Sequence, residues 1–199
     1  LLEVFPHVET WATTGGDLAL LASRRPILHD VSRLRERLAQ EPYRAALLAA
    51  WGVEGVEGLL AHHVAGPRTS RELARRADGW LNTDDQNALE FAFARNVGRG
   101  RPQLQGLAAL ARQLGDDLPP TQGPAYDREL LGRHRHGALA LDRTQLPTPP
   151  PQDDAEKARL DALRLYATRS AQAAYLAWQK QTGAPRTLLD RFIDCALVL

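Results

Sequence analysis

The chain has 199 residues, of which 44% are apolar and 25% charged, and its formal net charge is +1. This length can bury the core of one domain or slightly more. The near-neutral charge gives no electrostatic reason to expect nucleic acid or an anionic membrane as a partner. Cys195 is the single cysteine, so no intrachain disulfide can form and a reducing, cytoplasmic compartment is expected.

The two ends of the chain are apolar and contain no methionine. The chain opens on LLEVFP and stops on CALVL, whereas domain termini are usually polar and frayed. This pattern predicts that the chain is a fragment of a longer protein. The upstream part of the same polypeptide is then an expected partner. No apolar run is long enough to span a bilayer. A soluble segment without membrane contact is therefore expected, with a membrane-anchored parent protein left open.

A β-hairpin is predicted at the start of the chain. Residues 2–12 are rich in aromatic and β-branched side chains, the turn TTGGD follows, and residues 18–22 form a compact apolar run. The glycine pair suits a hairpin turn. A phosphate cradle would instead need a helix after the glycine loop, and a strand is predicted there.

Four short helices are predicted after the hairpin. Asp30 is the expected N-cap of the first, and Pro42 separates the first from the second. The third spans about 56–64. Thr69 and Glu72 form a capping-box pattern at the start of the fourth. An α-rich insert of this kind can cover an open sheet edge.

A further strand is predicted at 89–94, directly after a polar cluster. Leu89, Phe91 and Phe93 alternate with smaller or polar residues, a period of two that indicates a half-buried strand. The cluster Asn82-Thr83-Asp84-Asp85 places two carboxylates beside this strand. They can hold a turn or face a substrate.

Three segments resemble spermidine synthase-like proteins. The run N-T-D-D-x-N-x-L-E-F-A-x-A-R looks like the segment that closes their catalytic domain, and FPHVETWATTGGDLALLAS resembles its last hairpin. Between them, GVEGVEGLLAHHVAG looks like the family's short helical insert. The likeness covers about residues 1–99 and is closest to the long bacterial members that are fused to a transporter-like region.

The resemblance implies a Rossmann-like, methyltransferase-type domain that binds S-adenosylmethionine or its decarboxylated form. Such a domain would transfer an aminopropyl or methyl group to a small amine substrate. The family's glycine-rich cofactor loop is not in this sequence, so no cofactor-binding residue is assigned. The intact protein would be an aminopropyltransferase-like transferase, and this chain alone would be inactive. No catalytic residue is assigned either.

Four residues are the candidate substrate-binding residues. Asp84 and Asp85 could attract an amine, or Asn82 and Asp84 could make side-chain turns before the strand. Trp11 and His7 lie on the predicted hairpin, which the resemblance places on the amine side. The turn TTGGD departs from the Tyr-containing stretch of true synthases. Trp11 is also read as an ordinary aromatic core residue.

The histidine pairs and the cysteine receive structural interpretations. The spacings of His62-His63 and His134-x-His136 do not bring imidazoles to one side of a helix, so no metal site is predicted. The run 133–136 is interpreted as a solvated basic face. Cys195 is interpreted as a buried structural thiol.

The second half of the chain is predicted to be helical. Helices are expected at 103–114 and 125–141, a Pro-rich connector at 147–151, and a long helix at 154–181 with Trp178 on its apolar stripe. A last helix would start near Arg186. Trp178 is expected in the core of this helical part.

The predicted fold class is α+β, mostly α. A terminal β-hairpin and one further strand of a Rossmann-like domain would occupy residues 1–99, and an all-helical subdomain residues 100–199. The predicted function is the amine-transfer role implied by the resemblance. The alternative is a non-catalytic helical module or scaffold that binds a protein partner or a second copy of the chain.

Overall fold

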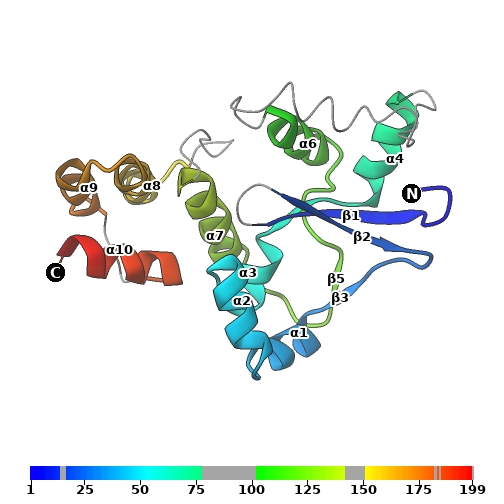
Figure 1. Cartoon of the computed structure of the whole chain (residues 1–199), viewed down its shortest axis with the longest axis horizontal. Helices are drawn as coiled ribbons and strands as arrows, with labels where there is room; N and C mark the ends of the chain where they lie inside the picture. The colour runs from blue at the N-terminus through cyan, green and yellow to red at the C-terminus, as the bar shows by residue number, and fades with distance from the viewer. Residues whose placement is uncertain (14–16, 78–101, 142–150, 182, 184, 199) are drawn as a thin grey trace. The chain divides into compact units, whose positions relative to one another are not determined.

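The computed structural model describes residues 1–13, 17–77, 102–141, 151–181, 183 and 185–198. The described chain is α+β and mostly helical (Figure 1), as predicted. It divides into two compact units. Unit 1 contains Leu1–His29 and His63–Gln122, and unit 2 contains Asp30–His62 and Gly123–Leu199. The predicted division at residues 99 and 100 stays a prediction, as does the Rossmann-like topology.

Unit 1 contains a three-stranded antiparallel sheet with the order β2-β1-β4. Strand β1 (His7–Ala12) pairs with β2 (Leu18–Ser23), and Glu9 lies opposite Leu21. The predicted hairpin is therefore confirmed. Strand β1 is central and its residues 8–11 are buried, whereas β2 lies at the edge of the described strands and has exposed leucines.

The strand on the other side of β1 begins where the sequence predicts the end of the third helix. Helix α3 (Gly55–Leu60) ends before the predicted residue 64, and His63–Ala65 forms strand β4. The backbone of β4 pairs with β1, with Trp11 opposite His63. Pairing with a strand that is distant in sequence competes with the local helical pattern, and tertiary context wins.

Helix α4 (Pro67–Arg76) begins two residues before the predicted cap at Thr69. The carboxylate of Asp116 caps it, because its Oδ2 accepts hydrogen bonds from Thr69 N at 2.7 Å and Thr69 Oγ1 at 2.9 Å. Gly66 makes this approach possible, since a Cβ there would lie 2.6 Å from Asp116 Oδ1. The predicted capping box at Thr69 and Glu72 is therefore wrong, and Glu72 instead pairs with two arginines of its own helix.

Two further segments of unit 1 are described. Helix α6 (Pro102–Gln113) agrees with the helix predicted at 103–114 and packs near β4. Strand β5 (Thr121–Gln122) pairs with β3 (His29–Asp30) in a second, two-stranded sheet. The strand predicted at 89–94 lies outside the described residues, as does most of the Pro-rich connector.

Unit 2 begins with the three helices α1, α2 and α3. Helix α1 (Val31–Leu38) has Asp30 as its N-cap, because the Asp30 carboxylate accepts a hydrogen bond from Arg33 N. Helix α2 (Tyr43–Trp51) follows Pro42 and ends at Gly52, whose φ of 64° suits glycine. The predicted cap and the predicted break at Pro42 are both confirmed.

In the C-terminal part of unit 2, the described residues form four helices. Helix α7 (Arg128–Leu141) starts three residues after the predicted position, and helix α10 (Leu188–Val198) closes the chain. The predicted helix at 154–181 is two helices, α8 (Asp154–Ala167) and α9 (Ala171–Trp178). The chain turns at Arg169, whose φ of 63° no α-helix accommodates.

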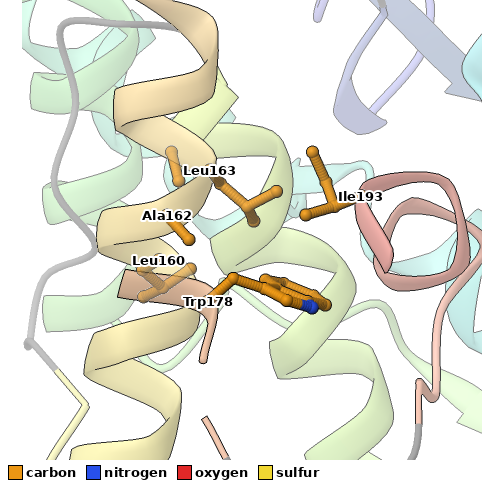
Figure 2. Packing of buried hydrophobic residues seen from close by; sticks show 6 residues of the cluster. Leu160, Ala162, Leu163, Trp178 and Ile193 are labelled. Carbon is orange, nitrogen blue, oxygen red and sulfur yellow. The ribbon is translucent and has the colours of Figure 1, made fainter. Parts of the chain in front are cut away.

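The turn between α8 and α9 lets the two helices pack on each other and fold the apolar stripe into a core. Figure 2 shows Trp178 beside side chains from α8 and α10. Trp178 is 3% exposed, and its indole N–H donates to Asp194 at 3.1 Å. The predicted burial of Trp178 is confirmed. The buried members of the cluster are Ala140, Leu160, Ala162, Leu163, Trp178 and Ile193.

A buried ionic network joins α7, α8 and α10. Asp190 is fully buried and forms an ion pair with the buried Arg159, and Arg133 Nε also donates to it at 3.2 Å. Thr187 and Asp190 cap α10 reciprocally, each side chain accepting from the other's backbone N–H at 3.0 Å. Gly137 leaves room for the Arg159 guanidinium, since a Cβ would lie 2.9 Å from it.

Candidate functional site

The four predicted substrate-binding residues do not all lie in the described part of the chain. Asp84 and Asp85 lie outside it. Trp11 is buried on β1, and His7 is half-buried at the start of the same strand. Residues two apart on a strand share a face, so His7 and Trp11 flank Glu9 on one side of β1. Glu9 is the residue of greatest chemical interest there.

Glu9 is a carboxylate in the interior of unit 1. Its exposed fraction is 0%, and it stands on the central strand between buried neighbours. Its Oε2 receives two hydrogen bonds, from Trp11 Nε1 at 3.1 Å and from His29 Nε2 at 2.9 Å. Among the described residues no group donates to Oε1, which is also buried.

The indole ring that donates to this carboxylate contacts two imidazole rings. The rings of Trp11 and His29 are 5.4 Å apart at 71°, and those of Trp11 and His63 are 5.2 Å apart at 85°. Both pairs have the edge-to-face geometry that aromatic rings prefer. His63 Nδ1 lies 3.2 Å from the carbonyl oxygen of Asp117. We call Glu9, Trp11, His29 and His63 the Glu9 cluster.

The Glu9 cluster is assembled from three separate segments of unit 1. Strand β1 supplies Glu9 and Trp11, the start of β3 supplies His29, and β4 supplies His63. The side chain of His29 is 14% exposed, whereas that of Glu9 is 0% exposed. His29 is therefore the member of this hydrogen-bonded pair that solvent can reach.

A buried carboxylate is costly unless its partners compensate for lost hydration. Two N–H donors compensate one oxygen of Glu9, and the other oxygen receives no such bond from the described chain. Polar groups that are left incompletely bonded inside a protein cluster at functional sites. This makes the Glu9 cluster the strongest candidate site in the described chain.

The other sequence candidates have different surroundings from those predicted. Residues 133–136 do not form a solvated face, because His134 is 8% exposed and the other three are half-buried. Burial and the charge of Arg159 lower the pKa of His134, so its imidazole is neutral near pH 7. Burial likewise lowers the pKa of His136. The interpretation as a solvated basic face is therefore wrong.

Cys195 is exposed, so its interpretation as a buried thiol is also wrong. It lies on α10 two residues after the buried Ile193, on a different face of the helix. Within the described ranges, no three His, Cys, Asp or Glu side chains are grouped to hold a metal ion. No described helix is both long enough and apolar enough to cross a bilayer.

Sequence reasoning missed Glu9 and His29. The available signal was a glutamate in the interior of an otherwise aromatic and β-branched strand, two residues from a tryptophan on the same face. His29 carried no local signal, because its partner is 20 residues away in sequence.

Three comparisons with known proteins were made. No family model matches the chain, and neither a curated protein nor a solved structure gives a match. The family resemblance therefore depends on the sequence segments alone.

Proposed function

We propose that residues 1–99 form the C-terminal part of a spermidine synthase-like domain. In that domain an aminopropyl or methyl group passes from a donor of the S-adenosylmethionine type to an amine. The chain contributes the amine side of the site and is inactive alone. The preceding part of the same polypeptide is its proposed partner, and a small amine is its proposed substrate.

The observation that carries this proposal is the exposure of β2 on both faces. Leu21 lies on the face of Glu9 and is 44% exposed, while Leu18 and Leu20 lie on the opposite face and are 46% and 58% exposed. An ordinary edge strand presents polar residues to solvent. A strand that is apolar on both faces is typical of the interior of a larger, covered sheet. Among the described strands β2 pairs with β1 alone, so its other edge suits a hairpin that continues another part of a sheet.

The described residues do not fit the sulfonium donor itself. Gly66 joins β4 to α4, which is a strand–glycine–helix arrangement. The amide of Thr69 at the start of α4 is already bonded to the Asp116 carboxylate, which also fills the space over Gly66. The donor site is therefore proposed to lie on the preceding part of the polypeptide, and no step through the donor is assigned to these residues.

The acidic pair Asp84 and Asp85 keeps its proposed role at the amine site. Replacing both with Asn in the longer protein is expected to weaken binding of a cationic amine and to leave thermal stability nearly unchanged. If the pair only caps a turn, stability should instead fall by about 0.5–2 kcal/mol while amine affinity stays the same.

The experiment that tests the function uses the longer polypeptide and the 199-residue chain in parallel. Each is incubated with labelled S-adenosylmethionine or its decarboxylated form and with 1,4-diaminobutane, and label in the amine is measured. We expect transfer by the longer polypeptide alone. Calorimetry of the 199-residue chain with either nucleoside should give no saturable heat. Tight nucleoside binding by this chain would contradict the assignment of the donor site to the preceding part.

A protein-interaction module is the second candidate function. Leu176 on α9 and Phe192 on α10 are 55% and 54% exposed, which favours a contact surface on unit 2. The apolar stripe that contains Trp178 is already buried within unit 2, so it does not need a protein partner to cover it. The transferase proposal therefore stands first.

A further inference from the structure

The hydrogen bond between Glu9 and His29 determines which nitrogen of the imidazole carries the proton. The indole N–H of Trp11 can only donate, so Glu9 Oε2 acts as an acceptor. The same oxygen lies 2.9 Å from His29 Nε2. In this arrangement Nε2 carries the hydrogen, and Nδ1 of the neutral ring has a free lone pair. No described residue bonds to Nδ1.

The surroundings of His29 also place a carboxylate beside its ring. A proton on Nδ1 would make the ring an imidazolium whose Nε2 remains 2.9 Å from a buried carboxylate. Attraction between opposite charges is strongest where water is excluded. The edge-to-face contact with Trp11 restrains the ring, and Glu9 itself is held by the Trp11 indole.

We propose that His29 accepts a proton from the ammonium group of an amine ligand, with Glu9 as the positioning residue that orients and supports its ring. The inference rests on the proposed function for the class of ligand and names the proton acceptor of that site. In this step an N–H bond of the ammonium breaks and its electron pair stays on the amine nitrogen. A new N–H bond forms at His29 Nδ1, and the positive charge moves from the amine to the imidazole.

This arrangement matches the general requirements of base catalysis. A carboxylate bonded to one imidazole nitrogen fixes the tautomer and raises the basicity of the other nitrogen. An amine must be in its neutral form to act as a nucleophile, and at neutral pH a simple alkylamine is mostly protonated. A proton acceptor is therefore needed at the amine side of any such transfer.

The first test measures the reactivity of His29 in the 199-residue chain. Diethyl pyrocarbonate acylates unprotonated imidazole nitrogens, and peptide mass spectrometry identifies each labelled histidine. At a pH where the ring is neutral in both chains, we expect Glu9→Gln to slow labelling of His29 by about tenfold, the lower end of the range by which loss of a histidine's hydrogen-bonded partner lowers metal affinity or activity. Glu9→Asp should restore part of the rate. Glu3→Gln, which removes an exposed carboxylate in the same segment, should leave it unchanged.

The second test identifies the ligand class. 1,4-Diaminobutane is expected to protect His29 from the reagent, while 1,4-butanediol, which has the same length and no charge, is not. Nitrogen-15 spectra of the imidazole, assigned with His29→Gln, should place the proton of the neutral ring on Nε2. This measurement uses the unmodified chain, so it decides the matter even if a Glu9 variant fails to fold.

Three results would overturn the proposal: equal labelling of His29 in the wild-type and Glu9→Gln chains, a neutral ring with its proton on Nδ1, or no protection by the diamine. None of these measurements involves a nucleoside donor. Their failure is therefore distinguishable from failure of the proposed transfer, which the labelled-nucleoside assay reports.

Discussion

Trp178 has the largest side chain among the buried members of the apolar cluster of unit 2. It is 3% exposed and bonds to Asp194 on α10. Trp178→Ala is expected to lower the free energy of unfolding by roughly 3–5 kcal/mol, as truncation of a buried tryptophan usually does. Urea denaturation measures this loss. Tyr175→Ala, on the same helix and 37% exposed, is the control and should cost much less. Equal losses for the two variants would contradict the packing.

The pKa of Asp190 predicts the direction in which acid changes the stability of unit 2. Burial acts to raise the pKa of Asp190, but the charge and hydrogen bond of Arg159 and the backbone bond of Thr187 outweigh it and hold the pKa below its ordinary value of 3.8. A carboxylate with a depressed pKa stabilises the fold above its ordinary pKa. That contribution disappears as the pH falls through the pKa of the folded state.

Asp190→Asn is therefore expected to cost roughly 3–5 kcal/mol near neutral pH, because Arg159 loses its buried counter-charge. The difference from the wild type should shrink as the pH falls below 3.8, the ordinary pKa of an aspartate. Urea denaturation at a series of pH values measures it. Asp161→Asn on α8, whose side chain is 61% exposed, is the matched control. A difference that stays constant across this pH range would exclude the proposed role of the charge.

At the scale of the elements, the start of α4 depends on a carboxylate from another segment. Asp116 caps the helix through Thr69, 47 residues away in sequence. Asp116→Ala is expected to destabilise unit 1 by about 0.5–2 kcal/mol, the usual cost of losing a cap. Thermal unfolding measures the loss. Glu3→Ala, which removes an exposed carboxylate of unit 1, should have the smaller effect unless the capping contact is absent in solution.

Elements whose signals are local were predictable from the sequence, and those with distant partners were not. Asp30 and Pro42 act on the residues beside them, and both predictions are confirmed. The turn at Arg169 was missed because no glycine or proline marks it. Strand β4 was read as helix because its pairing partner β1 lies more than 50 residues earlier.

The same reasoning applies to the candidate site. Trp11 stands out in the sequence as an aromatic residue on a predicted strand, and it does belong to the Glu9 cluster. The hydrogen bond from His29 depends on where the chain returns after the hairpin, which no local pattern specifies. The burial of Glu9 likewise depends on strands on both sides of β1.

At the scale of the whole molecule, unit 2 combines an early and a late segment of the chain. Helix α3 packs against α7, and Arg135 Nε donates to the carbonyl oxygen of Ala61 at 3.4 Å. In a chain ending at Gln122, α3 loses this partner. We expect the amides of Val56 and Leu60, which are almost fully buried in the full chain, to exchange rapidly with deuterium in the shorter one.

The amides of β1 should remain protected in the shorter chain, because all of its strand partners lie before residue 66. Hydrogen-exchange mass spectrometry compares the two chains. Retained protection of α3 without residues 123–199 would mean that this helix is stable independently of α7.

Each unit is built from two separate stretches of the chain, and the stretches of the two units alternate along the sequence. The order of synthesis therefore constrains the order in which the units assemble. When synthesis of this chain has reached residue 62, part of each unit has been made and neither unit is whole. Unit 1 can close first, once residue 122 has emerged, while α3 still lacks α7, the helix that packs against it in the complete unit 2. During that interval the nascent chain is most exposed to association with other chains and most dependent on chaperones.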